Sequence, residues 1–295
     1  MEPLHSFSDR KNNSIALVYR ARTPAAKASA QDLAAWLKTK KVIVYTGPDQ
    51  KLIPGTLPLK TSKQINTVRL FVVLGGDGTY LRAVRLLDGR QIPIVGFNMG
   101  SLGFLTNHTI DEMQDVIEKT LDNKMRLQAR ALLVCEVRRK SKTRGIFQAL
   151  NDVVIERGPM SQLISTAIYI DKLLVSEVKA DGIIISSPTG STAYNLAAGG
   201  PILDPEVKAL VVTPIAPHSL TSRPLIFPDN RNLSFKLEGK IHRGNLVIDG
   251  QRRLEISNTD EILIHRSKND HLLVRAPSHN FYHLLREKLK FGDRS

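Results

Sequence analysis

The sequence predicts an α/β N-terminal domain followed by an all-β, sandwich-like domain, with a C-terminal helix that returns to the first domain. Up to about residue 126, short apolar runs alternate with amphipathic segments, as in a doubly wound, Rossmann-like domain. After that point strand-like runs follow one another with little helix between them, which favours a β-sandwich. A chain of 295 residues is long enough for two domains. We expect one over residues 1–127 with 277–295 and the other over 128–276.

The first domain is expected to open with a polar, disordered segment, residues 1–13. Its strands are predicted from short apolar runs at 15–19, 42–45, 70–74 and 92–97. Its helices are predicted from amphipathic spacing and favourable first-turn residues at 25–40, from Thr79 onward and at 111–121. The proline-rich stretch 48–68 is predicted to be a loop.

The second domain is predicted almost wholly as strands. Short apolar or alternating runs place them at 131–137, 146–155, 164–170, 173–178, 183–186, 209–215, 233–238, 245–249, 261–265 and 271–275. The last segment, 280–291, has apolar residues at helical spacing. We therefore expect one more helix, packed back on the first domain.

The chain is strongly basic, with a net charge of +14, which admits nucleic acids, acidic lipids or phosphorylated small molecules as partners. The basic residues are dispersed, however, and only Arg138–Arg144 forms a tight run, which is interpreted as a solvated hairpin loop between two strands. Aromatic residues make up only 5%, and no zinc-finger or RNP-type motif occurs. An enzyme for anionic metabolites is therefore favoured over a nucleic-acid-binding module.

The number of cysteines and the hydropathy of the chain indicate the cellular compartment in which the protein is expected. The single cysteine, Cys135, rules out an internal disulfide framework and is interpreted as a core residue within an alternating stretch. No apolar run approaches the eighteen residues of a membrane-spanning helix, and the N-terminus lacks a signal-like segment. We expect a cytoplasmic protein without a membrane partner.

The stretch Leu70–Thr79 is the first candidate site. An apolar strand runs into Gly75-Gly76-Asp77-Gly78 and then into a helix start, a combination that suits phosphate because free N–H groups and the helix dipole point at it. It matches neither the G-x-G-x-x-G nor the Walker A pattern. The alternative is a tight turn in which Asp77 merely caps the following helix.

Two other glycine-rich loops follow predicted strands. Residues 96–103 follow a strand of the first domain, so the loops 75–78 and 96–103 are predicted to converge at one sheet edge. In the second domain, Asp181–Tyr194 runs from a strand into a hydroxyl-rich loop that suits ribose hydroxyls or phosphate, the alternative being helix capping by Ser191. Asn151-Asp152 opens a strand and is either a ligand-binding pair or an Asx turn.

Taken together, the motifs resemble the NAD kinase family, which converts NAD to NADP. They occur over nearly the whole chain, in the order Gly75-Gly-Asp-Gly-Thr79, Asn98-x-Gly-x-Leu-Gly-Phe104, Asn151-Asp152, Asp181-Gly through Pro188-Thr-Gly-Ser-Thr-Ala-Tyr194, and Gly199-Gly-Pro201. The first is shared with diacylglycerol, sphingosine and phosphofructokinase-type kinases, whereas the Thr-Gly-Ser-Thr-Ala-Tyr motif is much narrower.

The resemblance implies roles for particular residues. Asp77 would accept the proton of the adenosine ribose 2′-hydroxyl of NAD. The residues implied to bind NAD are Asp77, Gly78, Arg82, Asn151, Asp152, Lys179, Asp181, Thr192, Ala193, Tyr194, Asn195, Leu196, Ala197, Ala216 and Gln251. Asn195 and Ala197 depart from the serine that is frequent in the family, and Gln162 is left out of the site.

The same resemblance implies ATP as the phosphoryl donor, with inorganic polyphosphate as a second option, and a divalent metal ion, Mg²⁺ first, on the donor phosphates. No protein side chain is assigned to the metal. It also implies a homo-oligomer, a dimer or tetramer, and no nucleic-acid partner. Two alternatives stay open: another kinase of the Gly-Gly-Asp-Gly group acting on a lipid or sugar phosphate, and a non-catalytic NAD-binding regulatory protein.

Overall fold

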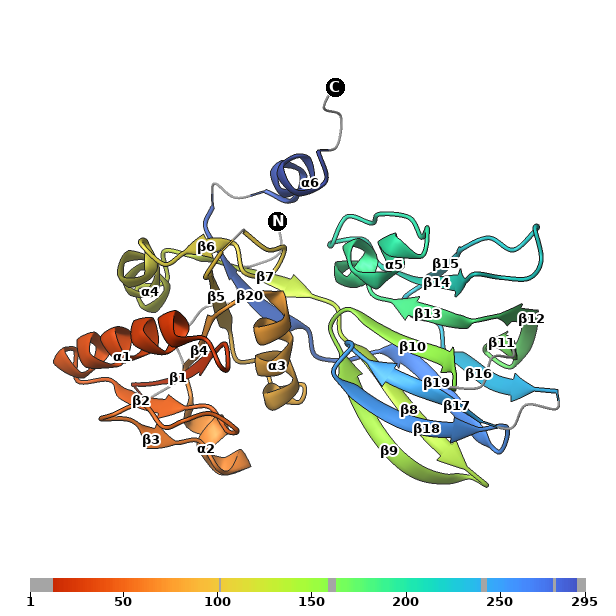
Figure 1. Cartoon of the computed structure of the whole chain (residues 1–295), viewed down its shortest axis with the longest axis horizontal. Coiled ribbons are helices and arrows are strands. Elements are labelled where there is room, and N and C mark those ends of the chain that lie inside the picture. Colours follow the sequence, from red (N-terminus) through yellow and green to blue (C-terminus); the bar gives the residue numbers. More distant parts are fainter. Residues whose placement is uncertain (1–12, 101, 159–162, 240–242, 278–279, 291–295) are drawn as a thin grey trace. The chain divides into compact units, whose positions relative to one another are not determined.

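The structure is a computed structural model that describes residues 13–100, 102–158, 163–239, 243–277 and 280–290. The chain divides into two compact units, residues 1–129 with 271–295, and residues 130–270 (Figure 1). The segment 1–12, most of the stretch expected to be disordered, lies outside the described residues, as do Gln162 and Phe291.

The first unit is built on one sheet with helices on both faces. Its strands, in spatial order, are β3 (Leu57–Pro58), β2 (Ile43–Thr46), β1 (Ser14–Tyr19), β4 (Leu70–Leu74), β5 (Ile94–Asn98), β20 (His271–Arg275) and β7 (Arg126–Arg130), with β6 (His108–Thr109) beside β5. Its helices are α1 (Pro24–Thr39), α2 (Ser62–Thr67), α3 (Asp77–Leu87), α4 (Met113–Leu121) and α6 (Phe281–Leu289). The described pairings from β3 through β5 to β20 are parallel.

The order of these strands makes the unit doubly wound. The chain moves outward from β1 to β2 and then crosses back to β4 and β5 on the other side of β1. Helices α1 and α4 pack with one face of the sheet in a common apolar core. Helix α3 covers the opposite face, where Tyr80 lies against Gly96. The prediction of a doubly wound α/β domain is confirmed.

Two assignments in this unit were wrong. Residues 271–275 were predicted to belong to the all-β domain but form β20 of the parallel sheet, where all five residues are buried because helices cover both faces. The predicted loop 48–68 contains α2, which begins at a capping box formed by Thr61 and Gln64. Proline content there masked a local helix signal.

The second unit consists of two antiparallel sheets. One has the order β15 (Leu225–Pro228), β14 (Ala209–Ile215), β13 (Gly182–Ser186), β10 (Asp152–Arg157), β17 (Arg243–Ile248) and β18 (Arg252–Ser257). The other has the order β12 (Leu173–Ala180), β11 (Ile164–Ile170), β16 (Leu233–Glu238), β19 (Asp260–Arg266), β8 (Leu133–Arg139) and β9 (Lys142–Ala149). Apolar residues from both sheets form one core, so the sandwich-like prediction is confirmed.

The predicted strand 146–155 is in fact two strands, β9 and β10, in different sheets. The chain changes sheet at Leu150-Asn151, and no glycine or proline marks the change. Strands β15 and β18 were not predicted, because their residues are largely exposed or charged. A short 3₁₀ turn (Thr189–Thr192) and helix α5 (Tyr194–Ala197) follow β13.

The basic run 138–144 forms the β8–β9 hairpin, as predicted, but two of its arginines are not merely solvated. Arg139 and Arg144 both bind Asp260, whose side chain is 0% exposed. The Ser257 backbone N–H donates to the same carboxylate at 2.8 Å. Part of the basic run therefore neutralises a buried acid of β19.

The last helix, α6, begins after Asn280, whose side chain accepts a hydrogen bond from the His283 N–H. Phe281 contacts Phe104 of the first unit at a ring-centroid distance of 6.3 Å. The expected return of this helix to the first domain is confirmed. Among the described helices, none is long and apolar enough to cross a membrane.

Candidate active site

The carboxylate of Asp77 is held by the second glycine-rich loop of the same unit. Helix α3 begins at Asp77, its N-cap is Gly76, and no side chain caps it. Oδ1 of Asp77 accepts the N–H groups of Leu105 and Thr106 at 3.2 and 3.0 Å and the Thr106 hydroxyl at 2.9 Å. Oδ2 accepts the Phe104 N–H at 3.0 Å. Asp77 therefore does not cap its helix, and the predicted convergence of the two loops is confirmed.

Gly103 is required by this contact. A Cβ built on Gly103 would lie 2.1 Å from Oδ1 of Asp77. Asn98, at the end of β5, supports the same arrangement because its amide donates to the Thr106 hydroxyl at 3.1 Å while its Oδ1 accepts the Gly100 N–H. The chain Asn98–Thr106–Asp77 fixes the carboxylate beside the glycine-rich turn.

Arg82 lies one helical turn after Gly78 on α3. Its Nη2 donates to the Tyr19 carbonyl at 2.8 Å, at the carboxyl end of β1. Burial and then the neighbouring Arg85 hold the pKa of Arg82 below its ordinary value. Arg82 is thus at the edge of the sheet where the strand order reverses, the usual ligand side of a doubly wound fold.

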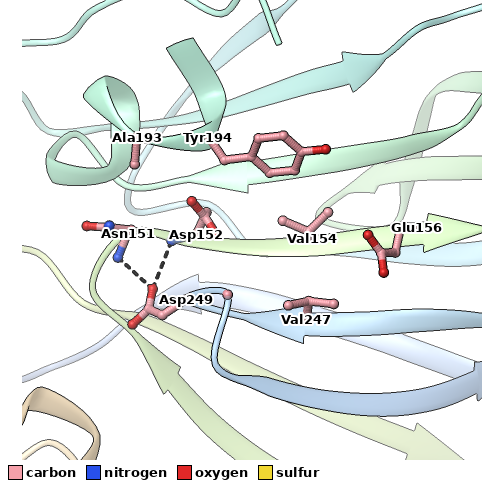
Figure 2. Close-up of a pocket in the computed structure, with 9 residues that line it drawn as sticks. Asn151, Asp152, Val154, Glu156, Ala193, Tyr194, Val247 and Asp249 are labelled. Atoms are coloured by element: carbon pink, nitrogen blue, oxygen red, sulfur yellow. Dashed lines mark hydrogen bonds between the residues drawn. The ribbon is translucent and has the colours of Figure 1, made fainter. Parts of the chain in front are cut away.

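Asn151 and Asp152 line a pocket of about 280 Å³ in the second unit (Figure 2). The other residues of its wall come from β10, β17, the turn after β17 and the start of α5, namely Val154, Glu156, Ala193, Tyr194, Val247, Asp249 and Gly250. The backbone N–H groups of Asn151 and Asp152 both donate to Asp249, at 2.8 and 3.1 Å.

Asp152 and Asp249 place two carboxyl groups in this pocket. Burial raises the pKa of Asp152 to about 7, and the charge of Asp249 adds to the effect. Burial also raises the pKa of Asp249 to about 6, against the opposing effect of three backbone N–H donors. Near neutral pH the pocket therefore holds titrating acids, which suit hydroxyl donors of a ligand better than its phosphates.

The hydroxyl-rich loop after β13 packs against the backbone of Asn151, on the carbonyl side of the turn. Gly190 must be glycine, since a Cβ there would lie 2.0 Å from the Asn151 carbonyl oxygen. Ser191 donates to the Pro188 carbonyl and accepts the Leu203 N–H, and Thr192 donates to the Thr189 carbonyl. These two hydroxyls bond within the loop, and neither caps a helix: α5 begins after Ala193 and the 3₁₀ turn after Pro188, both without a side-chain cap.

The residues at the end of this loop differ in what they can offer a ligand. Ala193 and Tyr194 line the pocket, and the Tyr194 side chain is 45% exposed. Leu196 is partly buried, Ala197 is exposed, and both lie on α5. The Asn195 side chain is 0% exposed and binds the carbonyls of Ser191 and Pro201 and the Thr213 hydroxyl.

The remaining residues of the predicted site are spread around the second unit. Asp181 pairs with Arg157 at 2.8 Å, and both line a second pocket, of about 330 Å³, together with Glu156 and Tyr194. Lys179 is exposed on β12. Ala216 follows β14 with a positive φ of 43°. Gln251 ends the turn after β17 and donates its backbone N–H to the Ile248 carbonyl.

Sequence reasoning missed three residues of these arrangements: Thr106, Glu156 and Asp249. A signal for Asp249 was present, because an aspartate before a glycine after an apolar strand is typical of a turn. Among the described residues, no group of three or more His, Cys, Asp or Glu side chains is arranged to hold a metal ion.

A glycine-rich turn at the switch point of a doubly wound sheet, with a fixed carboxylate beside it, defines a nucleotide-binding phosphotransferase class of fold and site. The family comparisons agree with this class. The ATP-NAD kinase N-terminal domain matches residues 15–125 and the ATP-NAD kinase C-terminal domain matches residues 150–276. The chain belongs to the NAD kinase family.

Individual relatives show how far the similarity extends. The NAD kinase of Bdellovibrio bacteriovorus is 58% identical over 97% of this chain and 94% of its own length. The crystal structure of yeast NADH kinase complexed with NADH has a TM-score of 0.86 at 28% identity, covering 96% of this chain and 89% of the other. An NAD kinase from Archaeoglobus fulgidus, crystallised in complex with ATP, shares the fold, with a TM-score of 0.75 at 23% identity over 92% and 98% of the two chains.

Proposed function

We propose that the protein transfers the γ-phosphoryl group of ATP to the 2′-hydroxyl of the adenosine ribose of NAD and so makes NADP. Family membership over both domains supports the overall reaction. The fixed carboxylate of Asp77 is the observation that carries the assignment of chemistry, because a ribose hydroxyl is a poor nucleophile and needs a base at its proton.

Asp77 is proposed as that base. Oδ1 accepts three hydrogen bonds and Oδ2 accepts one, so Oδ2 retains acceptor capacity for the hydroxyl proton. The carboxylate is held in advance by backbone groups, so little reorganisation is needed when the hydroxyl arrives. The proton moves from the 2′-oxygen to Asp77 as the bond from that oxygen to the γ-phosphorus forms and ADP leaves.

NAD is proposed to be held by Asn151 and Asp152 together with the start of α5. Their side chains line the pocket and can accept or donate to ribose hydroxyls and base edges. The full proposed set also includes Gly78, Arg82, Lys179, Asp181, Thr192, Ala193, Tyr194, Asn195, Leu196, Ala197, Ala216 and Gln251. Asn195 would contribute only through its backbone, because its side chain is buried and bonded internally.

The phosphoryl donor is proposed to enter as a complex of ATP with a divalent ion, Mg²⁺ first. The described residues do not form a carboxylate or histidine cage for such an ion. Mg²⁺ in phosphoryl-transfer enzymes is commonly bound through substrate phosphates, so the ion would arrive with the donor. The ion supplies charge neutralisation at the phosphates when it is bound.

We further propose a cytoplasmic homo-oligomer, a dimer or tetramer, that uses neither nucleic acid nor membrane as a partner. Support comes from the family resemblance and from the dispersed basic residues, two of which neutralise Asp260. Light scattering after size-exclusion chromatography measures the oligomer directly. A monomer at micromolar concentration would contradict this part of the proposal.

The reaction is tested by measuring NADP or NADPH formation with NAD or NADH as the acceptor, ATP or inorganic polyphosphate as the donor, and Mg²⁺ present or removed by EDTA. We expect NADP from NAD, ATP and Mg²⁺. Tight NAD binding without product would favour a regulatory protein. Phosphorylation of diacylglycerol or a sugar phosphate in place of NAD would favour another Gly-Gly-Asp-Gly kinase.

A further inference from the structure

In the turn that carries Asn151 and Asp152, consecutive backbone N–H groups donate to a single carboxylate. The N–H groups of Leu150, Asn151 and Asp152 all donate to the carboxylate of Asp249, at 2.9, 2.8 and 3.1 Å. Three consecutive N–H groups that converge in this way form a concave anion site. Here a side chain from the turn after β17 fills that site.

The carbonyl groups of the same turn are also bonded. The Leu150 carbonyl accepts the Ser187 hydroxyl, and the Asn151 carbonyl accepts the Ser187 N–H at 2.9 Å. The Asp152 carbonyl accepts the Asp249 N–H at 3.0 Å. Asp249 and Ser187 thus satisfy the backbone of the turn from two sides.

The hydrogen bonds that hold this turn are made by its backbone groups, and not by the side chains of Asn151 and Asp152. Both side chains line the pocket, as Figure 2 shows, while the bonds to Asp249 run from the backbone. The direction in which the two side chains point is therefore set by a residue about a hundred positions away in the sequence. Without that carboxylate, three neighbouring N–H groups would lose their acceptor, which costs free energy and permits the turn to relax.

We propose that Asp249 is a positioning residue of the NAD site, which fixes the side chains of Asn151 and Asp152 for the ligand by binding the backbone beneath them. The inference rests on the proposed function. It assigns Asp249 no contact with the reacting atoms. The raised pKa of Asp249 agrees with its burial against the turn.

Asp260 provides a matched control. It is also a buried aspartate of the second unit, and its donors include Arg139, Arg144 and the Ser257 N–H. It begins β19, opposite Arg139 of β8, and does not line the Asn151 pocket. Both Asp249→Asn and Asp260→Asn replace a buried carboxylate by an amide, whereas a loss of NAD-site geometry is expected from Asp249→Asn alone.

The first measurement is amide hydrogen exchange over residues 150–152 in the full chain without ligand. We expect faster exchange in Asp249→Asn and in Asp249→Ala, and wild-type exchange in Asp260→Asn. Unchanged exchange at the turn in Asp249→Ala would overturn the inference while leaving the proposed kinase reaction intact.

The second measurement is the Kd of NAD by calorimetry, beside the Kd of ATP. We expect Asp249→Ala to raise the Kd of NAD by about 10- to 100-fold, which is the effect of one or two lost hydrogen bonds. The Kd of ATP should stay within about twofold of the wild-type value. If Asp249→Ala does not fold, Ser187→Ala removes the brace on the carbonyl side, and about a fivefold weaker Kd of NAD is expected.

Equal Kd values of NAD in folded Asp249→Asn and the wild type would contradict the positioning role, as would an equal loss in Asp260→Asn. Failure of the wild type to form NADP despite binding NAD would contradict the proposed reaction instead. The two failures are therefore distinguishable.

Discussion

Thr106 donates twice to the same oxygen of Asp77, through its backbone N–H at 3.0 Å and its hydroxyl at 2.9 Å. The two residues belong to different glycine-rich loops that follow neighbouring parallel strands, β4 and β5. Parallel neighbours end at the same edge of a sheet, so loops about thirty residues apart meet there. The catalytic carboxylate that we propose is thus positioned by the fold rather than by its own helix.

This relationship predicts that Gly103→Ala lowers the turnover rate. The added Cβ would lie 2.1 Å from Oδ1 of Asp77, so the carboxylate must move. We expect kcat to fall by about 100-fold, since a displacement of the order of 1 Å can cost that much. Gly100→Ala is the matched control in the same loop, because among the described residues its Cβ would meet Asn98 at an ordinary contact distance of 3.8 Å. Equal kcat values for the two variants would contradict the positioning of Asp77 by this loop.

The raised pKa of Asp152 predicts a pH-dependent cost of stability. The folded protein holds this proton up to about pH 7, whereas the ordinary value is 3.8. The carboxyl therefore costs nothing below its unfolded pKa, and its cost grows as pH rises through about 7. The cost is complete above about pH 7, and at about 1.4 kcal/mol per pKa unit over the rise from 3.8 to about 7 it reaches at most about 4.5 kcal/mol.

Asp152→Asn removes that cost, because an amide does not ionise. We expect its free energy of unfolding to exceed that of the wild type at pH 9 by about 2–4 kcal/mol, and to differ much less at pH 4.5. Urea denaturation at both pH values measures the difference. A difference that is constant with pH would contradict the assigned titration.

Asp260→Asn is expected to destabilise the second unit. Its carboxylate is 0% exposed and binds Arg139, Arg144 and the Ser257 N–H, so the amide brings an NH2 group, which cannot accept, into a buried position surrounded by donors. A loss of about 3 kcal/mol at pH 7 is expected by urea denaturation. The control is Arg138→Ala, since Arg138 pairs with Glu136 in the same strand and its side chain is 45% exposed. The loss from Arg138→Ala should be much smaller.

The pKa of Asp260 gives the sign of the pH effect. Burial acts to raise it, but hydrogen bonds from Arg139, Ser257 and Arg144 outweigh burial and hold the pKa below its ordinary value. The stabilisation is therefore full above the unfolded pKa of 3.8 and is lost as pH falls through the lower, folded value. The difference between the wild type and Asp260→Asn should shrink on acidification below pH 4.

The fold class was predictable from sequence because its signals are local. Strands such as Leu70–Leu74 and Leu233–Glu238 carry their apolar periodicity within a few residues, and their observed bounds match those expected. The break between β9 and β10 was not predictable from local pattern, because the acceptor of its backbone N–H groups is Asp249, which lies about a hundred residues away. β20 was assigned to the wrong sheet because the sequence of a five-residue strand does not indicate which strands it pairs with.

The candidate site was predictable in part, and for the same reason. The glycine-rich turns and Asn151-Asp152 are contiguous motifs, so their pattern alone indicated a ligand site. The partners that fix them are distant in sequence: Thr106 for Asp77, and Asp249 for Asn151. For Ser191 and Thr192 the motif was found, but their hydroxyls form hydrogen bonds to carbonyls of their own loop, which the sequence pattern does not reveal.

The central claim is that Asp77 accepts the proton of the NAD 2′-hydroxyl. It is tested most directly by single-turnover formation of NADP from NAD, ATP and Mg²⁺ with the wild type and Asp77→Asn. The asparagine retains the size of the side chain, so circular dichroism should match the wild type, and each variant is measured at saturating NAD so that a change in Kd does not lower the rate. We expect the rate of phosphoryl transfer to fall by about 10³-fold or more. A rate within about tenfold of the wild type would contradict the assignment.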